Sequence, residues 1–160
     1  MLIRAATEDD HDAVWAILEP TIRGGETYAL DRDMSRENAL AYWFAPDRET
    51  FVAETPDGIL GTYYLRPNQA GGGNHVCNCG YMTRPDATGR GIARAMVAHS
   101  LDHARARGYR AMQFNFVVST NTRAIRLWEQ HGFETLTRLP QAFLHPAAGY
   151  VDALVMFRTL

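Results

Sequence analysis

Two glycines stand in the segment Thr88-Gly89-Arg90-Gly91-Ile92-Ala93, between a strand-like run and a long helical pattern. Because glycine has no Cβ, a ligand can approach its backbone closely. The unpaired N–H groups and the positive dipole end of the following helix favour an anion, above all a phosphate or pyrophosphate. Arg90 and Arg94 would add positive charge. A lone GxG pattern is more often a tight turn without a ligand, and the full Walker and dinucleotide patterns are absent.

A second segment, residues 121–133, reads NTRAIRLWEQHGF. Taken alone, it indicates an amphipathic helix that Thr120 or Asn121 opens and Gly132 ends. By itself this pattern predicts a structural element and no chemistry.

Together the two segments resemble the GNAT superfamily of acyl-CoA-dependent N-acetyltransferases. The superfamily's phosphate-binding pattern is [QR]xxGx[GA], and TGRGIA matches it except at the first position. Its second pattern is NxxAxxLYxxxGF, which here reads NTRAIRLWEQHGF. The resemblance covers about residues 1–158 and is strongest from Tyr81 to Phe133. It implies an α/β fold with a mixed, mostly antiparallel sheet, a splayed central parallel strand pair and flanking helices.

The resemblance also implies that acetyl-CoA is the co-substrate. The strand that ends at residues 81–83 would diverge from the strand at 111–118, and the pantetheine arm would enter between them. The pyrophosphate would lie on the amides of the glycine turn. The expected cofactor-binding residues are Tyr81, Met82, Thr83, Thr88, Gly89, Arg90, Gly91, Ile92, Ala93, Arg94, Asn121 and Trp128.

This sequence departs from the superfamily's pattern at two positions. Thr88 replaces a Gln or Arg, which removes a side-chain contact but leaves the backbone amides. Trp128 replaces the Tyr that often protonates the leaving thiolate, and an indole has no proton to give at neutral pH. Water or another group must therefore protonate the CoA thiolate, or it leaves unprotonated.

The acceptor amine must lose a proton, because a primary alkylamine has a pKa of about 10.4. The superfamily often uses a Glu on the fourth strand as base, and none lies between Gly71 and Thr83. A base could be His75, Glu26 or Asp152, a relay through Tyr28 or Tyr64 could serve instead, and Asn78 or Asn115 could orient a water. We expect the backbone N–H of Met82 or Thr83 to hold the oxyanion.

The acceptor side is expected in two loop regions, residues 24–28 and 139–143. Tyr and Phe side chains there could close over a substrate. The candidate substrate-binding residues are Glu26, Tyr28, Phe143 and Asp152.

Three functions are consistent with these residues. The first is an enzyme that transfers the acetyl group of acetyl-CoA to a small primary amine by direct attack in a ternary complex. The second is an acyl-CoA-binding sensor or regulatory domain whose catalysis has eroded, which Trp128 and the missing strand Glu favour slightly. The third is a peptide or protein N-acetyltransferase.

The periodicity of apolar residues predicts the elements that must position these groups. Helices are expected from Thr7 to Pro20, from Ser35 to before Pro46, over 89–107 and over 121–132. Strands are expected at 2–5, 51–54, 59–65, 75–83, 111–118, 133–139 and 150–158, with a hairpin turn at Asp57-Gly58 and a loose loop at 68–73. The order βααβββαβαββ contains hairpins, so the sheet should be mixed.

Composition sets outer limits on function. A length of 160 residues fits one domain spanning 1–160, and a net charge of −2 gives no case for nucleic acid or an anionic membrane. All sixteen basic residues are Arg, which excludes Lys-based chemistry. Cys77 and Cys79 are too few for a disulfide framework or a zinc site, so no metal and a cytoplasmic location are expected. A homodimer is possible.

Overall fold

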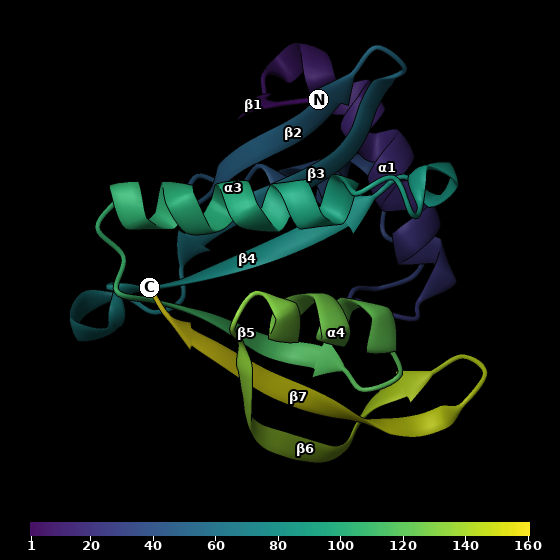
Figure 1. Cartoon of the computed structure of the whole chain (residues 1–160). Helices are drawn as coiled ribbons and strands as arrows, with labels where there is room; N and C mark the ends of the chain where they lie inside the picture. The colour runs from purple at the N-terminus through teal and green to yellow at the C-terminus, as the bar shows by residue number, and fades with distance from the viewer.

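The computed structural model describes residues 1–160 and contains one seven-stranded sheet in the order β1-β2-β3-β4-β5-β7-β6 (Figure 1). The strands are β1 Leu2–Ala5, β2 Glu49–Thr55, β3 Gly58–Pro67, β4 Val76–Thr83, β5 Ala111–Val118, β6 Glu134–His145 and β7 Gly149–Thr159. The helices are α1 His11–Gly24, α2 Arg36–Trp43, α3 Ile92–Ala106 and α4 Thr122–Gln130. Five strand pairs are antiparallel and β4–β5 is parallel. The fold class expected from the sequence is confirmed.

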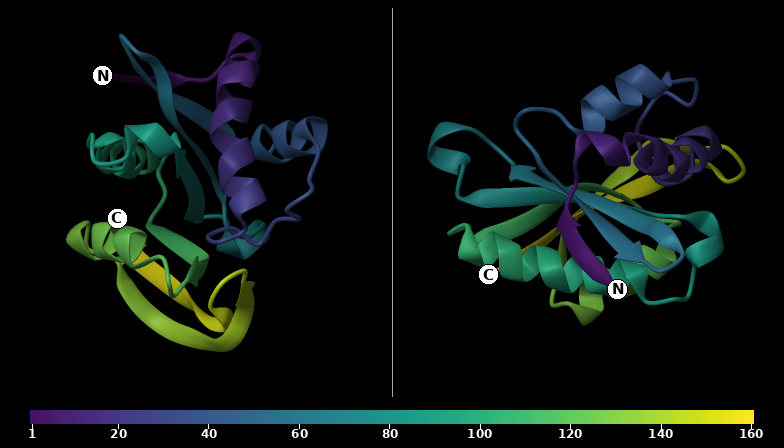
Figure 2. Two further views of the ribbon diagram at one scale, coloured as in Figure 1. Left: turned by 90° about the vertical axis from the view of Figure 1, so that its right-hand side faces the viewer. Right: turned by 90° about the horizontal axis from the view of Figure 1, so that it is seen from above.

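The sheet lies between two layers of helices (Figure 2). α1 and α2 cover one face, and α3 and α4 cover the other. Because side chains alternate along a strand, each face has its own apolar core. The larger core packs Tyr63, Cys79 and Met112 beneath α3, and the smaller one packs Val52, Tyr64 and Met82 beneath α1 and α2. The strands thus separate two cores that meet only through the sheet.

Helix α1 continues past Pro20, so the prediction that Pro20 limits it was wrong. Proline removes one backbone hydrogen bond from a helix. Here the apolar stripe continues beyond it, and Ile22 is 2% exposed, so burial of the last turn outweighs that loss. Gly25 ends the helix in the left-handed region at φ 64°, where an added Cβ would meet Arg32. The chain after α1 is thereby turned toward the carboxyl end of β4.

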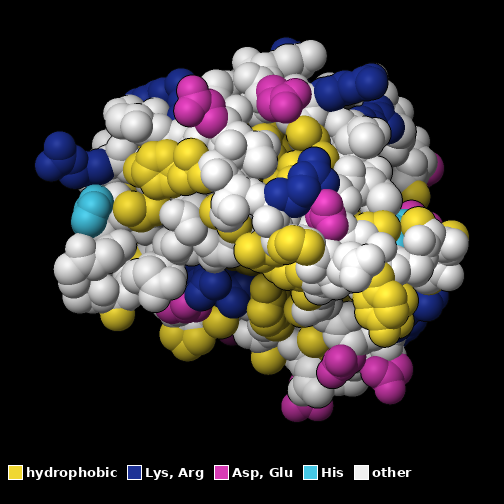
Figure 3. Space-filling model, turned by 90° about the horizontal axis from the view of Figure 1, so that it is seen from below, with side chains coloured by type: hydrophobic (Ala, Val, Ile, Leu, Met, Phe, Trp, Pro, Cys, Tyr) yellow, Lys and Arg dark blue, Asp and Glu magenta, His cyan; other side chains and the backbone are white.

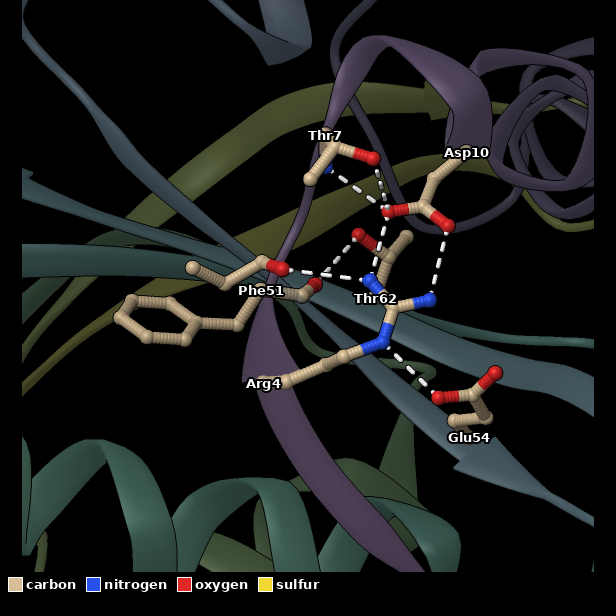
Figure 4. A network of polar contacts seen from close by, with 7 residues as sticks. Arg4, Thr7, Asp10, Phe51, Glu54 and Thr62 are labelled. Atoms are coloured by element: carbon tan, nitrogen blue, oxygen red, sulfur yellow. Dashed lines mark hydrogen bonds and ion pairs between the residues drawn. The ribbon is translucent and has the colours of Figure 1, made fainter.

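The connection from β1 into α1 is fixed by a charged cluster (Figure 4). Arg4 donates to both carboxylate oxygens of Asp10 at 2.8 and 2.9 Å and to Glu54 Oε2 at 2.8 Å. The Thr7 N–H donates to Asp10 Oδ2 at 2.8 Å. Nearby, Thr62 Oγ1 donates to the Phe51 carbonyl at 2.8 Å. The bidentate pairing of Arg4 with Asp10 orients the start of α1 against the sheet.

The last hairpin is longer than the predicted strand 133–139, because β6 runs on to His145. Its register with β7 shifts between Leu139 and Phe143, where Gln141 has a φ of 50°. The Asp152 carboxylate accepts from the Gln141 N–H at 2.9 Å and from Arg138 at 2.9 Å. Asp152 therefore holds this irregularity in place.

The face seen from below carries exposed hydrophobic groups between charged side chains (Figure 3). The large exposed hydrophobic residues of the last strands are Phe116, Leu136, Leu144 and Tyr150. They do not identify a partner, so the homodimer stays a prediction. None of the helices has the length and apolar character needed to cross a membrane.

Candidate active site

Strands β4 and β5 pair only at their beginnings and then separate (Figure 1). The paired positions are Val76 with Ala111 and Cys77 with Met112. One residue further on, the Asn78 side-chain amide donates to the Gln113 carbonyl at 2.9 Å, which closes the base of the opening. Beyond it, β5 is irregular against β7 between Phe114 and Val117. The expected splaying of the parallel pair is confirmed.

The unpaired edge of β4 offers backbone groups to this opening. Tyr28 Oη donates to the Tyr81 carbonyl at 2.9 Å, whereas the Arg84 N–H donates to the Leu60 carbonyl of β3 at 2.9 Å. Because backbone groups alternate sides along a strand, the polar groups of Tyr81 and Thr83 face the opening. By the same alternation, the Met82 N–H faces β3. Of the two amides expected to hold the oxyanion, only that of Thr83 is therefore directed at the opening.

A cavity of about 850 Å³ fills the opening and extends to both faces of the sheet. Its size is in the range of small-molecule sites, roughly 300–1,000 Å³. The only charged side chains that line it are Arg66, Arg94, Arg123 and Arg126; no Asp, Glu or His does so. The site is therefore electropositive and contains no carboxylate or imidazole base.

The glycine turn forms the end of the cavity beneath α3. Gly89 and Gly91 have φ of 83° and 78°, which side chains rarely adopt. Nothing lies within 4 Å of a Cβ built on Gly91, so its open side faces free space. α3 begins at Ile92 with Gly91 as N-cap and no side-chain cap, which leaves its first amides free for a ligand. These features fit the pyrophosphate of acetyl-CoA.

The arginines of this turn have different surroundings. Arg94 lines the cavity and donates to Gln130 Oε1 at 2.7 Å. The Arg90 side chain instead forms a 2.6 Å ion pair with Asp57 and does not line the cavity. The backbone N–H of Arg90 donates to the Ala87 carbonyl at 3.3 Å. Arg123 lies 4.0 Å from the position of a Gly89 Cβ. Helix α4 thus places the positive charge of Arg123 beside the glycine turn, and the sequence patterns did not predict this residue.

Helix α4 supplies Asn121 and Trp128 to the other wall of the cavity. Asn121 occupies the N-cap position, but its side chain makes no capping hydrogen bond. The Trp128 ring packs 5.1 Å from the Tyr81 ring and 4.9 Å from the Phe114 ring. Trp128 therefore belongs to an aromatic cluster beside the β4 edge, and the Asn121 carboxamide is available to a ligand.

The opposite end of the cavity lies beneath α1 and α2 and is aromatic. Tyr28, Tyr42 and Tyr64 line it, and the Tyr42 and Tyr64 hydroxyls lie 3.5 Å apart. Burial raises the pKa of Tyr28 and of Tyr64 above the usual range, so both hydroxyls stay protonated near neutral pH. Gly80 permits this packing, because a Cβ there would lie 2.6 Å from the Tyr64 ring.

Several sequence candidates lie outside the cavity. His75 is exposed in the turn just before β4, six residues before Tyr81, which is about 20 Å along a strand. Glu26 is exposed next to the lining residue Thr27. Asp152 is held at the β6 irregularity, where hydrogen bonds from the Gln141 N–H and Arg138 lower its pKa. The ring centroid of Phe143 lies 6.3 Å from that of Phe116. Of the predicted acceptor residues, Tyr28 alone lines the cavity.

Two cavity residues at the acceptor end, Tyr42 and Arg66, were not predicted. The signal for Arg66 was the alternation on β3, which places it on the same face as Tyr64. Tyr42 carried no comparable signal, because its position depends on how α2 packs on the sheet.

A mixed sheet opened between β4 and β5, with a glycine turn at the opening, defines the GNAT class of fold. The model of the Acetyltransferase (GNAT) family matches residues 11–133, and the chain belongs to this family. The chain is 32% identical over 151 residues to the N-acetyltransferase aca1 of Schizosaccharomyces pombe. The matched region covers 84% of this chain and 72% of that protein.

Solved structures show the same likeness. A GCN5-related N-acetyltransferase from Kribbella flavida superposes with a TM-score of 0.94 at 39% identity, covering 99% of this chain and 97% of that one. The protein yncA from Salmonella typhimurium, solved with its cofactor acetyl-CoA, superposes with a TM-score of 0.87 and covers 100% of this chain and 94% of that one. Because it is 23% identical, its likeness shows the fold alone.

Proposed function

We propose that the chain transfers the acetyl group of acetyl-CoA to a primary amine of a small molecule, by direct attack in a ternary complex. The observation that carries this proposal is the continuity of one cavity from the glycine turn, past the free edge of β4, to the tyrosines beneath α1 and α2. Two substrates could therefore meet at the opening from opposite faces of the sheet.

The acetyl-CoA side uses groups that are already oriented. The pyrophosphate would lie on the first amides of α3, and the pantetheine arm would pair with the Tyr81 N–H and the backbone groups of Thr83, beside the Tyr81 carbonyl that accepts from Tyr28 Oη. The Asn121 side chain would contact this arm. The Thr83 N–H would donate to the thioester oxygen as negative charge develops there.

The transfer step needs a neutral amine. Its nitrogen lone pair attacks the thioester carbon, the N–C bond forms, and the C–S bond breaks with the electron pair leaving on the CoA sulfur. Because no Asp, Glu or His lines the cavity, we assign the amine proton to water, which Asn78 and Asn115 could orient. The thiolate leaves as such or takes a proton from water.

Thiol release from acetyl-CoA over a panel of small amines and short peptides tests this proposal. Release with a small amine, and formation of the acetylated amine, is the expected result. Release with peptides alone would establish the peptide acetyltransferase instead. Tight acetyl-CoA binding without release over the whole panel would favour the sensor domain and contradict the proposal.

A further inference from the structure

The acceptor end of the cavity contains one arginine, Arg66. Arg66 lies on β3 opposite Asn78 of β4, on the sheet face that Tyr64 shares. Its Nε is buried and has no hydrogen-bond partner, and its only ion-pair contact is Asp47 Oδ2 at 3.5 Å. A guanidinium has five N–H donors, and Arg66 lines the cavity, so its terminal nitrogens can donate to a ligand there.

A second arginine adds positive charge behind this one. The Arg48 guanidinium carbon lies 4.1 Å from the centre of the Tyr42 ring and 4.3 Å from that of Tyr64. Its charge is balanced by Asp47, 3.4 Å away, which is the carboxylate that Arg66 also contacts. Two guanidinium groups therefore share one carboxylate, and this corner of the protein has a net positive charge.

This charge distribution discriminates between classes of amine. A polyamine or an extended cationic chain would bring further positive charge to a corner that lacks a carboxylate for it. A carboxylate would instead match the planar fork of Arg66 and complete its hydrogen bonds. From Asn78, opposite Arg66, to Tyr81 is three residues, about 10 Å along the strand, so both ends of a small molecule fit between Arg66 and the β4 edge.

We propose that Arg66 binds a carboxylate of the acceptor, so that the acceptor is an amine that also carries a carboxylate, as an amino acid does. This inference rests on the proposed acetyl transfer and names its substrate class. Tyr28, Tyr42 and Tyr64 would surround the rest of the acceptor. Arg66 is then a residue that decides specificity, and the remaining cavity arginines lie toward the acetyl-CoA side.

The test compares matched acceptors: L-amino acids, their carboxamides and the corresponding decarboxylated amines, with spermidine as a polyamine. We expect the wild-type protein to prefer the carboxylates in kcat/KM. Arg66→Met should lower kcat/KM for the carboxylates by about tenfold to a hundredfold, the size of losing a hydrogen bond to a charged group, and leave the KM for acetyl-CoA unchanged. Arg66→Lys should recover part of the preference.

Arg36→Met is the matched control, because Arg36 lies on the exposed side of α2 in an ion pair with Asp12. It should leave the preference as it is. A wild-type preference for spermidine or for the carboxamides, or an undiminished carboxylate preference in folded Arg66→Met, would overturn the inference.

Titration calorimetry separates failure of the inference from failure of the proposed function. If no amine releases thiol, the amino acids are titrated into the CoA-saturated protein. Binding that Arg66→Met abolishes would keep the carboxylate site and refute the transfer reaction. Absence of any carboxylate-dependent binding would refute the inference as well.

Discussion

Trp128 packs beside the opening through ring contacts that a phenyl ring could also make. Its neighbours are the rings of Tyr81 and Phe114, at 5.1 and 4.9 Å. An indole N–H can donate a hydrogen bond but is not an acid near neutral pH. In the proposed reaction, this position would therefore contribute packing beside the pantetheine arm rather than a proton for the thiolate.

Trp128→Phe tests this assignment, because phenylalanine keeps an aromatic ring and removes the N–H. Turnover should fall by less than about a hundredfold, the low end of a general-acid contribution. Steady-state kinetics with saturating acetyl-CoA measures it, and a titration of acetyl-CoA provides the control for binding. A larger loss of turnover at unchanged affinity would give Trp128 a chemical role.

Asp10 makes stability depend on pH at the acidic end. The hydrogen bonds from Arg4 lower the pKa of its carboxyl from 3.8 to about 2, and the Thr7 N–H acts in the same direction. Because the pKa is lower in the folded state, the pair stabilises the protein above about pH 4 and loses this effect as the pH falls toward 2.

Asp10→Asn should therefore lower the free energy of unfolding near neutral pH by about 2 kcal/mol, the loss of a charged hydrogen-bond pair. Urea unfolding at a series of pH values should show the difference between wild type and variant shrinking between pH 3.8 and about 2. A difference that stays constant across this window would show that the Asp10 charge is unimportant for stability.

At the scale of elements, the glycine turn and α3 form the unit that would bind the pyrophosphate. Gly91→Asp would place a Cβ and a negative charge in space that is open in the structure. Because Gly91 has a φ of 78°, a side chain there also strains the backbone, so the control variant must carry the same strain. Calorimetric titration should show acetyl-CoA affinity at least about tenfold lower, which corresponds to about 1.4 kcal/mol.

Gly149→Asp is the matched control for this variant. Gly149 has a φ of 72° and nothing within 4 Å of an added Cβ, and it is the first residue of β7, far from the glycine turn in sequence. The two variants thus share the backbone strain and the charge change. An acetyl-CoA affinity of Gly91→Asp equal to that of Gly149→Asp would place the pyrophosphate elsewhere.

The sequence predicted the elements well where local patterns decide them. The hairpin at Asp57-Gly58, the Ser35 cap and the strand at 111–118 lie as expected. α3 begins at Ile92, three residues after the predicted helix start at Gly89, because Gly89 and Gly91 both adopt positive φ. The length of β6 could not be predicted, because it depends on the contact between Asp152 and the Gln141 N–H eleven residues away.

At the scale of the whole molecule, the two faces of the sheet have different roles. The resemblance to GNAT proteins predicts the acetyl-CoA side, because the residues proposed for it are close together in sequence. The acceptor side combines α1, α2, β3 and β4, and its residues come together only through tertiary packing. This is why His75, Glu26 and Asp152 were candidates and Arg66 was not.

The absence of a carboxylate or imidazole from the cavity lining predicts the pH dependence of turnover. The rate should rise with pH toward the pKa of the acceptor amine, because only its neutral form attacks. His75→Ala, Glu26→Gln and Tyr28→Phe should each retain this rise. Loss of turnover and a flat profile in one of them, with acetyl-CoA still bound, would identify that residue as the base.

Direct attack in a ternary complex has one structural competitor, which is acetylation of the protein itself. Cys79 is the only thiol that lines the cavity. Burial raises its pKa well above the usual range, so it is a thiol and a poor nucleophile near neutral pH. The geometry therefore favours the amine as the group that attacks acetyl-CoA.

Initial rates measured while both acetyl-CoA and the amine are varied test this claim most directly. The account predicts double-reciprocal lines that intersect, no acetylated protein by mass spectrometry in the absence of amine, and turnover that persists in Cys79→Ala. Parallel lines, together with an acetyl group on Cys79 that the amine then removes, would contradict it.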